Sequence, residues 1–197
     1  MKVLLLGKKA ELLVTSLQNY KLFLHQEKIS RDQVETWAPD LIVSFGYRHL
    51  LSDEVLNYPP SGALNLHISL LPWNRGSDPN FWSWLENTPK GVSIHHMVRK
   101  LDAGPIVSQK ELELSKASTL KQTYDVLVAE TIKLFPLALD SHLAGEAVLP
   151  QGLTQGTFHK TADLDAFRFL LREKGWDTLC GTIQKYGEQN GLWKEVF

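Results

Sequence analysis

Short apolar runs alternate along this chain with segments in which apolar residues recur at helical spacing. The runs predict β-strands at residues 2–6, 21–25, 41–43, 63–68, 92–98 and, as a longer edge strand, 106–114. The helical spacing predicts helices that open after Ser30 and Ser52, and helices over residues 12–17, 80–86, 119–145 and 163–174, with a kink at Pro136. Strands alternating with helices predict an α/β fold whose mostly parallel sheet is covered on both faces in three layers.

The predicted strand at residues 63–68 carries two polar side chains where apolar ones are the rule. Leu64, Leu66 and Ile68 share one face, whereas Asn65 and His67 share the other. Both faces of a parallel sheet are usually buried, so polar side chains there are costly unless they are hydrogen-bonded or functional. Asn65 and His67 are therefore either a structural pair or part of a site.

A carboxylate follows the next strand within a tight turn. Asp102 precedes Ala103-Gly104-Pro105, and the simpler interpretation is that it only organises this turn. With Asn65 and His67, however, it would complete a set made of an amide, an imidazole and a carboxylate. Such a set suits acyl transfer to an amine, because the amide and the imidazole can stabilise an oxyanion. No nucleophile-elbow sequence is present, which favours direct attack without a covalent intermediate.

Composition narrows the alternatives. The formal net charge of −1 and the absence of long basic runs argue against a nucleic-acid partner. The single cysteine, Cys180, excludes an intramolecular disulfide and a zinc-finger site, and it is interpreted as a core residue. The N-terminal apolar run is too short for a signal peptide or a membrane span, so we expect a cytoplasmic protein without a membrane partner.

Three segments together resemble a known enzyme family. Residues 65–72 (NLHISLLP), 91–95 (GVSIH) and 101–106 (LDAGPI) are similar, in order and spacing, to the formyltransferases that use 10-formyltetrahydrofolate. The resemblance covers about residues 1–145, and Ile68 departs from it, because the family usually has proline there. It implies a Rossmann-like catalytic domain at residues 1–150, with a small C-terminal extension at 151–197 packing on it.

The resemblance also implies roles for individual residues. Asn65 would hold the formyl oxygen, His67 would assist amine attack, and Asp102 would orient His67. The folate co-substrate would bind against Tyr47, Arg48, His49 and Leu50 and against the loop from Val98 through Leu101 to Asp102. His95 is expected to pack near the site rather than take part in the chemistry, and no metal is expected.

The acceptor is the least determined part of the prediction. The loop after Gly7 lacks the glycines that would cradle a ribonucleotide phosphate, and the chain lacks the basic C-terminal domain of the methionyl-tRNA branch. Residues 73–83 and 88–92 are similar to enzymes that act on nucleotide-linked amino sugars, so we predict a 4-amino-4,6-dideoxyhexose acceptor. The residues predicted to bind it are Lys8, Lys9, Trp73, Asn74, Arg75 and Asn80, although two solvated lysines are the simpler interpretation of Lys8 and Lys9.

Other functions remain as alternatives. A formylation domain of a nonribosomal peptide synthetase has the same sequence character, but the absence of an adenylation or carrier segment favours the sugar enzyme. A metal-dependent hydrolase could use His67, His95 and Asp102, yet it would leave Asn65 without a role. A folate- or sugar-binding protein would need the pocket without the catalytic set. The aromatic C-terminal part, from Phe158 to Phe197, is expected to form core or a homodimer interface rather than a nucleobase platform.

Overall fold

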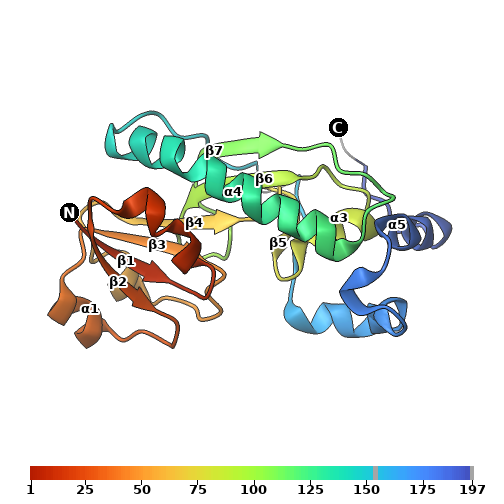
Figure 1. The fold of residues 1–197 in the computed structure, drawn as a ribbon, viewed down its shortest axis with the longest axis horizontal. Helices are drawn as coiled ribbons and strands as arrows, with labels where there is room; N and C mark the ends of the chain where they lie inside the picture. Colours follow the sequence, from red (N-terminus) through yellow and green to blue (C-terminus); the bar gives the residue numbers. More distant parts are fainter. Residues whose placement is uncertain (153–154, 196–197) are drawn as a thin grey trace. The chain divides into compact units, whose positions relative to one another are not determined.

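The computed structural model describes residues 1–152 and 155–195, so Phe197 lies outside the described residues. A six-stranded sheet has the strand order β2-β1-β3-β4-β6-β7, and β5 and β8 form a separate two-stranded sheet (Figure 1). The β1–β2, β1–β3 and β3–β4 pairs are all parallel. The strands are β1 (Lys2–Leu6), β2 (Lys21–His25), β3 (Leu41–Phe45), β4 (Ala63–His67), β5 (Arg75–Gly76), β6 (Gly91–His96), β7 (Ile106–Glu111) and β8 (Phe158–His159).

Most helices lie where the sequence predicts them. The α-helices are α1 (Arg31–Trp37), α2 (Asp53–Leu56), α3 (Pro79–Leu85), α4 (Leu120–Leu143) and α5 (Cys180–Gln189). Ser30 and Gln33 form the predicted capping box of α1, and the Ser52 side chain caps α2. The 3-10 helices are η1 (Ala10–Leu13), η2 (Thr15–Leu17), η3 (Thr161–Leu171) and η4 (Gly175–Asp177). The predicted α/β fold with its mostly parallel sheet is therefore confirmed.

Three features differ from the sequence prediction. The segments near residues 12–17 and 163–174 are helical but form 3-10 helices. The short β5 and β8 strands were not predicted, because two residues are too few for a periodic signal. Helix α5 was also missed, since two glycines and several polar residues dilute its apolar pattern.

The chain divides into two compact units. The first comprises Met1–His67, Ile94–Ser108 and Ile132–Pro150, and the second comprises Ile68–Ser93, Gln109–Thr131 and Gln151–Phe197. The predicted extension at residues 151–197 thus shares the second unit with two earlier segments.

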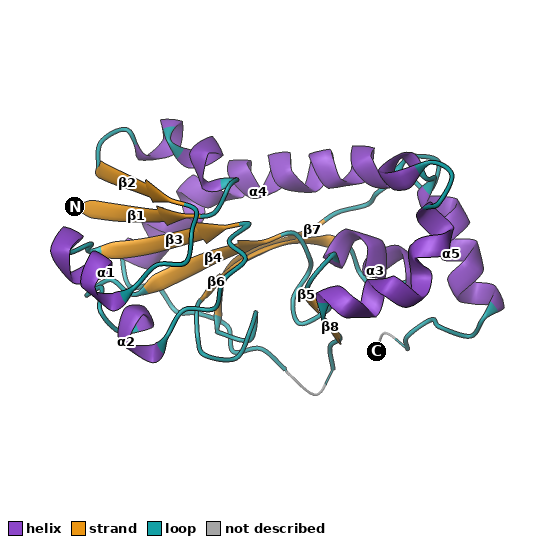
Figure 2. Cartoon of the chain, turned by 90° about the horizontal axis from the view of Figure 1, so that it is seen from below, coloured by secondary structure: helices purple, strands orange, loops and turns teal. Residues whose placement is uncertain are grey.

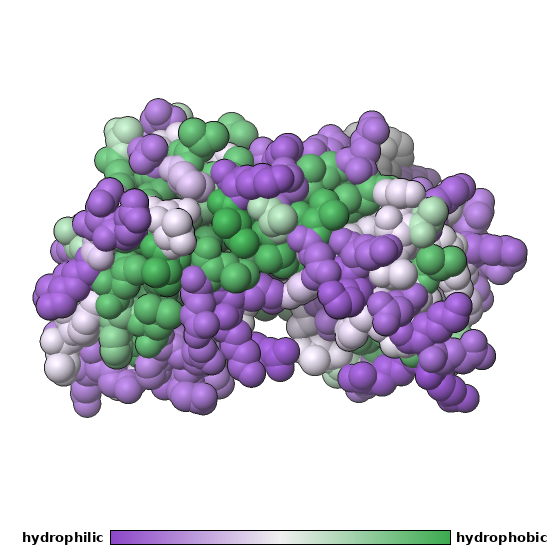
Figure 3. Space-filling model, in the orientation of Figure 1, coloured by the Kyte–Doolittle hydropathy of each residue, from purple (hydrophilic) through white to green (hydrophobic). Residues whose placement is uncertain are grey.

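The first unit has the expected layers. Leu4, Leu6 and Ile42 of the sheet pack with Val34 of α1 and Val55 of α2 in one buried cluster. In Figure 2, α1 and α2 lie on one side of β1 and β3, and the C-terminal half of α4 lies on the other. Phe135 and Leu139 of that half are buried, whereas Leu137 is 68% exposed. Hydrophobic residues reach the surface in several places on the face drawn in Figure 3.

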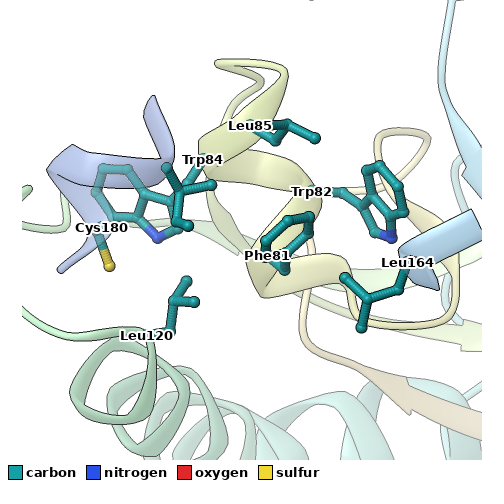
Figure 4. Close-up of a cluster of buried hydrophobic side chains, with 8 residues drawn as sticks. Phe81, Trp82, Trp84, Leu85, Leu120, Leu164 and Cys180 are labelled. Carbon is teal, nitrogen blue, oxygen red and sulfur yellow. The ribbon is translucent and has the colours of Figure 1, made fainter. Parts of the chain in front are cut away.

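The second unit has its own apolar core, in which α3 contacts α5. Figure 4 shows aromatic side chains of α3 in this cluster, with Leu120 and Cys180 near Trp84 and Leu164 near Trp82. Cys180 is buried, as predicted for a core residue. No helix in the described ranges is both long and apolar enough to cross a membrane.

Candidate functional site

Strand β4 brings the predicted polar pair into the first unit. Leu64 and Leu66 are buried on one face of the strand, and His67, on the other, is only 7% exposed. Ser44 of the neighbouring β3 is in register with Asn65, so a small residue lies beside the asparagine. The alternation that the sequence indicates is therefore present, and the two polar side chains need partners within the site.

Asp102 comes from the turn between β6 and β7. Its backbone has φ +49°, in the left-handed region that Asp tolerates better than most residues. A Cβ atom at Gly104 would lie 1.9 Å from the carbonyl oxygen of His96, so only glycine fits at this close approach. The turn thus holds Asp102 in a buried position, in which the residue is only 7% exposed.

The predicted residues meet in one buried polar cluster. The Nδ1 atom of His67 lies 3.6 Å from Oδ2 of Asp102, and the Asn65 amide donates to Oδ1 of Asp102 over 3.1 Å. The two carboxylate oxygens therefore serve different partners. Because Asp102 lies on the Nδ1 side of the imidazole, Nε2 is the ring nitrogen that points away from the carboxylate.

His95 belongs to the same cluster, close to where the sequence places it. The ring is 1% exposed, with Nε2 at 3.2 Å from Nδ2 of Asn65 and 3.4 Å from Oδ1 of Asp102. Its Nδ1 lies 2.8 Å from the carbonyl oxygen of His96. A carbonyl oxygen only accepts, so Nδ1 carries a proton and Nε2 accepts in the neutral ring.

The Asn65 amide has two acceptors within the cluster. Nδ2 of Asn65, Nε2 of His95 and Oδ1 of Asp102 form a triangle with sides of 3.1, 3.2 and 3.4 Å. The amide can donate to either acceptor, and an oxyanion that approached Nδ2 would be a third acceptor for the same group.

The residues predicted to hold folate are largely exposed in the first unit. Arg48, His49 and Leu50 are exposed, with Leu50 at 71%, and Val98 and Leu101 are each 42% exposed. Tyr47 differs, because its hydroxyl accepts from the Ile29 amide and donates to the Glu27 carbonyl. Burial raises the pKa of Tyr47. Folate binding by these residues stays a prediction, and the Tyr47 hydroxyl is held by the backbone of Glu27 and Ile29.

The residues predicted to bind the acceptor fall into different environments. Lys8 is exposed, and the Lys9 ammonium lies 5.7 Å from the centre of the Phe45 ring. In the second unit, Trp73 is half-buried and its carbonyl accepts from the Ser69 hydroxyl. Acceptor binding by these three residues stays a prediction.

Asn74 and Asn80 are buried, and their amides make internal hydrogen bonds. Asn74 donates to the Thr88 hydroxyl over 2.7 Å and accepts from Thr157. Asn80 donates to the Leu120 carbonyl over 2.8 Å and accepts from Thr123. These bonds tie the loop and α3 to distant parts of the second unit, and contact with the acceptor stays a prediction for both.

Arg75 is the remaining residue of this set and is only 6% exposed. Its Nε donates to the Thr157 carbonyl over 3.4 Å. Thr157 therefore contacts both Asn74 and Arg75, although the sequence analysis did not single it out. A threonine in a polar loop gives no signal for such a role.

His96 follows His95 on β6, and its carbonyl contacts the His95 ring. Burial lowers the pKa of His96, and its neighbours His142 and His95 lower it further. Its ring meets that of His142 edge-on at 5.0 Å. Among the described residues, no group of three or more His, Cys, Asp or Glu side chains is arranged to hold a metal ion.

The chain is similar to a known enzyme family and to several solved structures. The Formyl transferase family model matches residues 8–139. The solved structure of the formyltransferase PseJ from Anoxybacillus kamchatkensis, in complex with UDP-4,6-dideoxy-4-formamido-L-AltNAc and tetrahydrofolate, is 35% identical with a TM-score of 0.87. The match covers 94% of this chain and 100% of PseJ.

Two more distant structures share the fold. A sugar N-formyltransferase from Shewanella sp FDAARGOS_354 is 20% identical with a TM-score of 0.75, over 93% of this chain and 86% of that one. Phosphoribosylglycinamide formyltransferase from Bacillus Halodurans is also 20% identical, with a TM-score of 0.64 over 73% of this chain and 95% of that one.

Proposed function

Because this chain belongs to the formyl transferase family, we propose that it moves the formyl group of 10-formyltetrahydrofolate to the amine of a nucleotide-linked 4-amino-4,6-dideoxyhexose. The observation that carries the chemistry is the buried cluster of Asn65, His67 and Asp102. The acceptor class rests on PseJ, whose bound ligands are a 4-formamido sugar nucleotide and tetrahydrofolate.

The reaction needs no covalent intermediate with the protein. The acceptor nitrogen attacks the formyl carbon, a C–N bond forms, and the formyl oxygen becomes an oxyanion. The amide of Asn65 and the imidazole of His67 stabilise this oxyanion. The intermediate collapses by breaking the bond to N10 of the folate, which takes up the proton that the amine loses.

Asp102 acts through His67. A carboxylate 3.6 Å from Nδ1 favours the tautomer with a proton on that nitrogen and fixes the orientation of the ring. The proton of the attacking amine can then pass by way of His67, Asp102 and a bound water to the leaving nitrogen. The exposed apolar side chains of Leu50, Val98 and Leu101 would contact the folate.

An assay with a defined set of acceptors tests this proposal. Purified protein would be incubated with 10-formyltetrahydrofolate and with UDP- and dTDP-linked 4-amino-4,6-dideoxyhexoses or an aminoacyl carrier domain, and the formylated product identified by mass spectrometry. We expect formyl transfer to an amino-sugar nucleotide. Transfer only to the carrier-bound amino acid would instead support a synthetase formylation domain.

Single substitutions test the cluster. Asn65→Ala, His67→Ala and Asp102→Ala should each reduce kcat strongly, and His25→Ala, which changes a histidine of β2, serves as control. If transfer survived all three changes, the mechanism would be wrong. A homodimer and a cytoplasmic location remain predictions from the sequence.

A further inference from the structure

His95 is a buried histidine of the first unit, and both of its ring nitrogens have partners there. The residue is 1% exposed and lies on β6, the strand next to β4 in the sheet. Its Nδ1 donates to the His96 carbonyl over 2.8 Å, so Nε2 carries a lone pair in the neutral ring. That lone pair lies 3.2 Å from Nδ2 of Asn65. The ring therefore accepts from a residue that the proposed mechanism places on the formyl oxygen.

The carboxamide of Asn65 could turn either its oxygen or its nitrogen toward the cluster, and its partners decide between the two. Nδ2 lies 3.2 Å from Nε2 of His95 and 3.1 Å from Oδ1 of Asp102, and both of these atoms are acceptors. A half-turn of the amide would bring its oxygen against the same two acceptors, which would cost both hydrogen bonds and add repulsion between lone pairs. Two acceptors thus hold the nitrogen end of Asn65 toward the cluster.

The two acceptors are held in different ways. The carboxylate of Asp102 has His67 on its other oxygen, at 3.6 Å, so its position depends on a second titratable side chain. The ring of His95 is held instead by a backbone carbonyl of its own strand. Its Nε2 lies 3.4 Å from Oδ1 of Asp102, a contact between two acceptors that the amide donor of Asn65 relieves. His95 is therefore the acceptor that the backbone fixes.

We propose that His95 is a positioning residue for formyl transfer, which holds the carboxamide of Asn65 in the orientation that presents its N–H to the oxyanion. This assignment rests on the proposed function for the reaction that Asn65 serves. A donor is most effective when it is oriented before the charge develops, because no reorganisation is then needed. The effect of His95 passes through Asn65 and needs no contact with the formyl group or the folate. Loss of the Nε2 acceptor should thus lower kcat and leave the KM for 10-formyltetrahydrofolate unchanged.

Two amide substitutions at position 95 separate the roles of the two ring nitrogens. The side-chain amide of His95→Gln can reach the place of Nε2 and accept from Asn65, whereas the shorter side chain of His95→Asn reaches only the place of Nδ1. With the sugar nucleotide as acceptor, His95→Asn should lower kcat roughly tenfold to a hundredfold and His95→Gln less than about threefold. The KM for 10-formyltetrahydrofolate should change less than about twofold in both. His25→Asn, the same change at a histidine of β2, is the control and should leave kcat unchanged.

Urea unfolding separates positioning from a purely structural role. If His95 only filled the core, both variants would unfold at lower urea concentrations, and the kcat of the folded fraction would equal that of the wild type. Such a result would overturn the assignment. So would equal losses of kcat in His95→Gln and His95→Asn, because the two variants differ in the acceptor that they offer to Asn65.

Nitrogen NMR tests the same arrangement without turnover and needs only the wild type, should His95→Asn fail to fold. In alkaline buffer the His95 ring should carry its proton on Nδ1, and a proton on Nε2 would overturn the assignment. The side-chain amide signals of Asn65, identified by their loss in Asn65→Ala, should shift in His95→Asn and stay near their wild-type positions in His95→Gln. Sugar formylation by the wild type with an undiminished kcat in His95→Asn would refute this inference and leave the proposed function intact. The expected NMR signals in a wild type that formylates no sugar nucleotide would do the reverse.

Discussion

The two units of the protein each contain a buried or half-buried asparagine, and the partners of the two side chains differ. Asn65 in the first unit contacts the carboxylate of Asp102 and the ring of His95, both of which can exchange protons. Asn80 in the second unit contacts a backbone carbonyl and a threonine hydroxyl, which stay neutral. We expect the amide among titratable groups to serve the chemistry and the amide among neutral groups to hold the fold.

The largest effect on activity should come from removing the negative charge of Asp102 in the polar cluster. Asp102→Asn keeps the shape of the side chain but removes the negative charge beside His67, so kcat should fall by roughly 10²- to 10⁴-fold. Steady-state kinetics measures this fall, and the midpoint of urea unfolding should stay near that of the wild type. Asp32→Asn, at an exposed position of α1, is the matched control. A change in KM alone would mean that Asp102 serves binding and not chemistry, and the proposed difference between the surroundings of Asn65 and Asn80 would then be wrong.

In the second unit, Lys90 should make the free energy of unfolding depend on pH. Burial lowers the pKa of Lys90 to about 8, although its ammonium lies 4.4 Å from the Trp84 ring centre and donates to two carbonyl groups. The unfolded chain holds this proton up to pH near 10.5, so unfolding takes up a proton between these values. The free energy of unfolding contributed by Lys90 therefore rises with pH across that window.

The Lys90→Met variant isolates this contribution. The difference in unfolding free energy between wild type and variant should shift in favour of the wild type by up to about 3 kcal/mol between pH 8 and pH 10.5. Urea unfolding at several pH values measures it. A difference that stayed constant with pH would mean that Lys90 titrates normally in the folded protein.

A smaller loss of stability should follow from Asn80→Leu. The change leaves the Leu120 carbonyl and the Thr123 hydroxyl without one partner each, which should lower the free energy of unfolding by about 2 kcal/mol. The kcat of the folded fraction should stay within about twofold of the wild type, if Asn80 only holds the fold. A large rise in the KM for the acceptor with unchanged stability would instead support the predicted role in substrate binding.

The smallest effect tests whether activity depends on the polar cluster alone or on any change in the first unit. Ser30 caps α1 in the first unit through a capping box with Gln33. Ser30→Ala should lower the free energy of unfolding by about 1 kcal/mol and leave kcat unchanged. A clear loss of activity would show that the first unit responds as a whole rather than through its cluster.

Much of the first unit could be predicted from sequence because its signals are local. The β1–β4 strands are apolar runs, the capping box at Ser30 is a short motif, and Asn65 and His67 break an otherwise apolar strand. The turn at Asp102 was predictable as a turn, but its approach to Asn65 depends on which strands are neighbours. That information entered through the family resemblance and not through periodicity.

The second unit was harder to predict because its contacts join residues far apart in the chain. Thr157 bonds Asn74 across 83 positions, and Phe158 pairs with Arg75 in strands of two residues. Neither contact leaves a pattern within a sequence window. The burial of Arg75 could not be predicted from the sequence either, since an arginine in a polar loop is ordinarily solvated.

The close approach at Gly104 links the backbone to the protonation form of a side chain. The His96 carbonyl that leaves no room for a Cβ at Gly104 is also the acceptor for Nδ1 of His95. Any side chain at position 104 would displace that oxygen, and His95 would then be able to carry its proton on Nε2. The amide of Asn65 would meet a donor in place of an acceptor. A glycine without any polar side-chain atom thus selects the tautomer of His95 in the polar cluster.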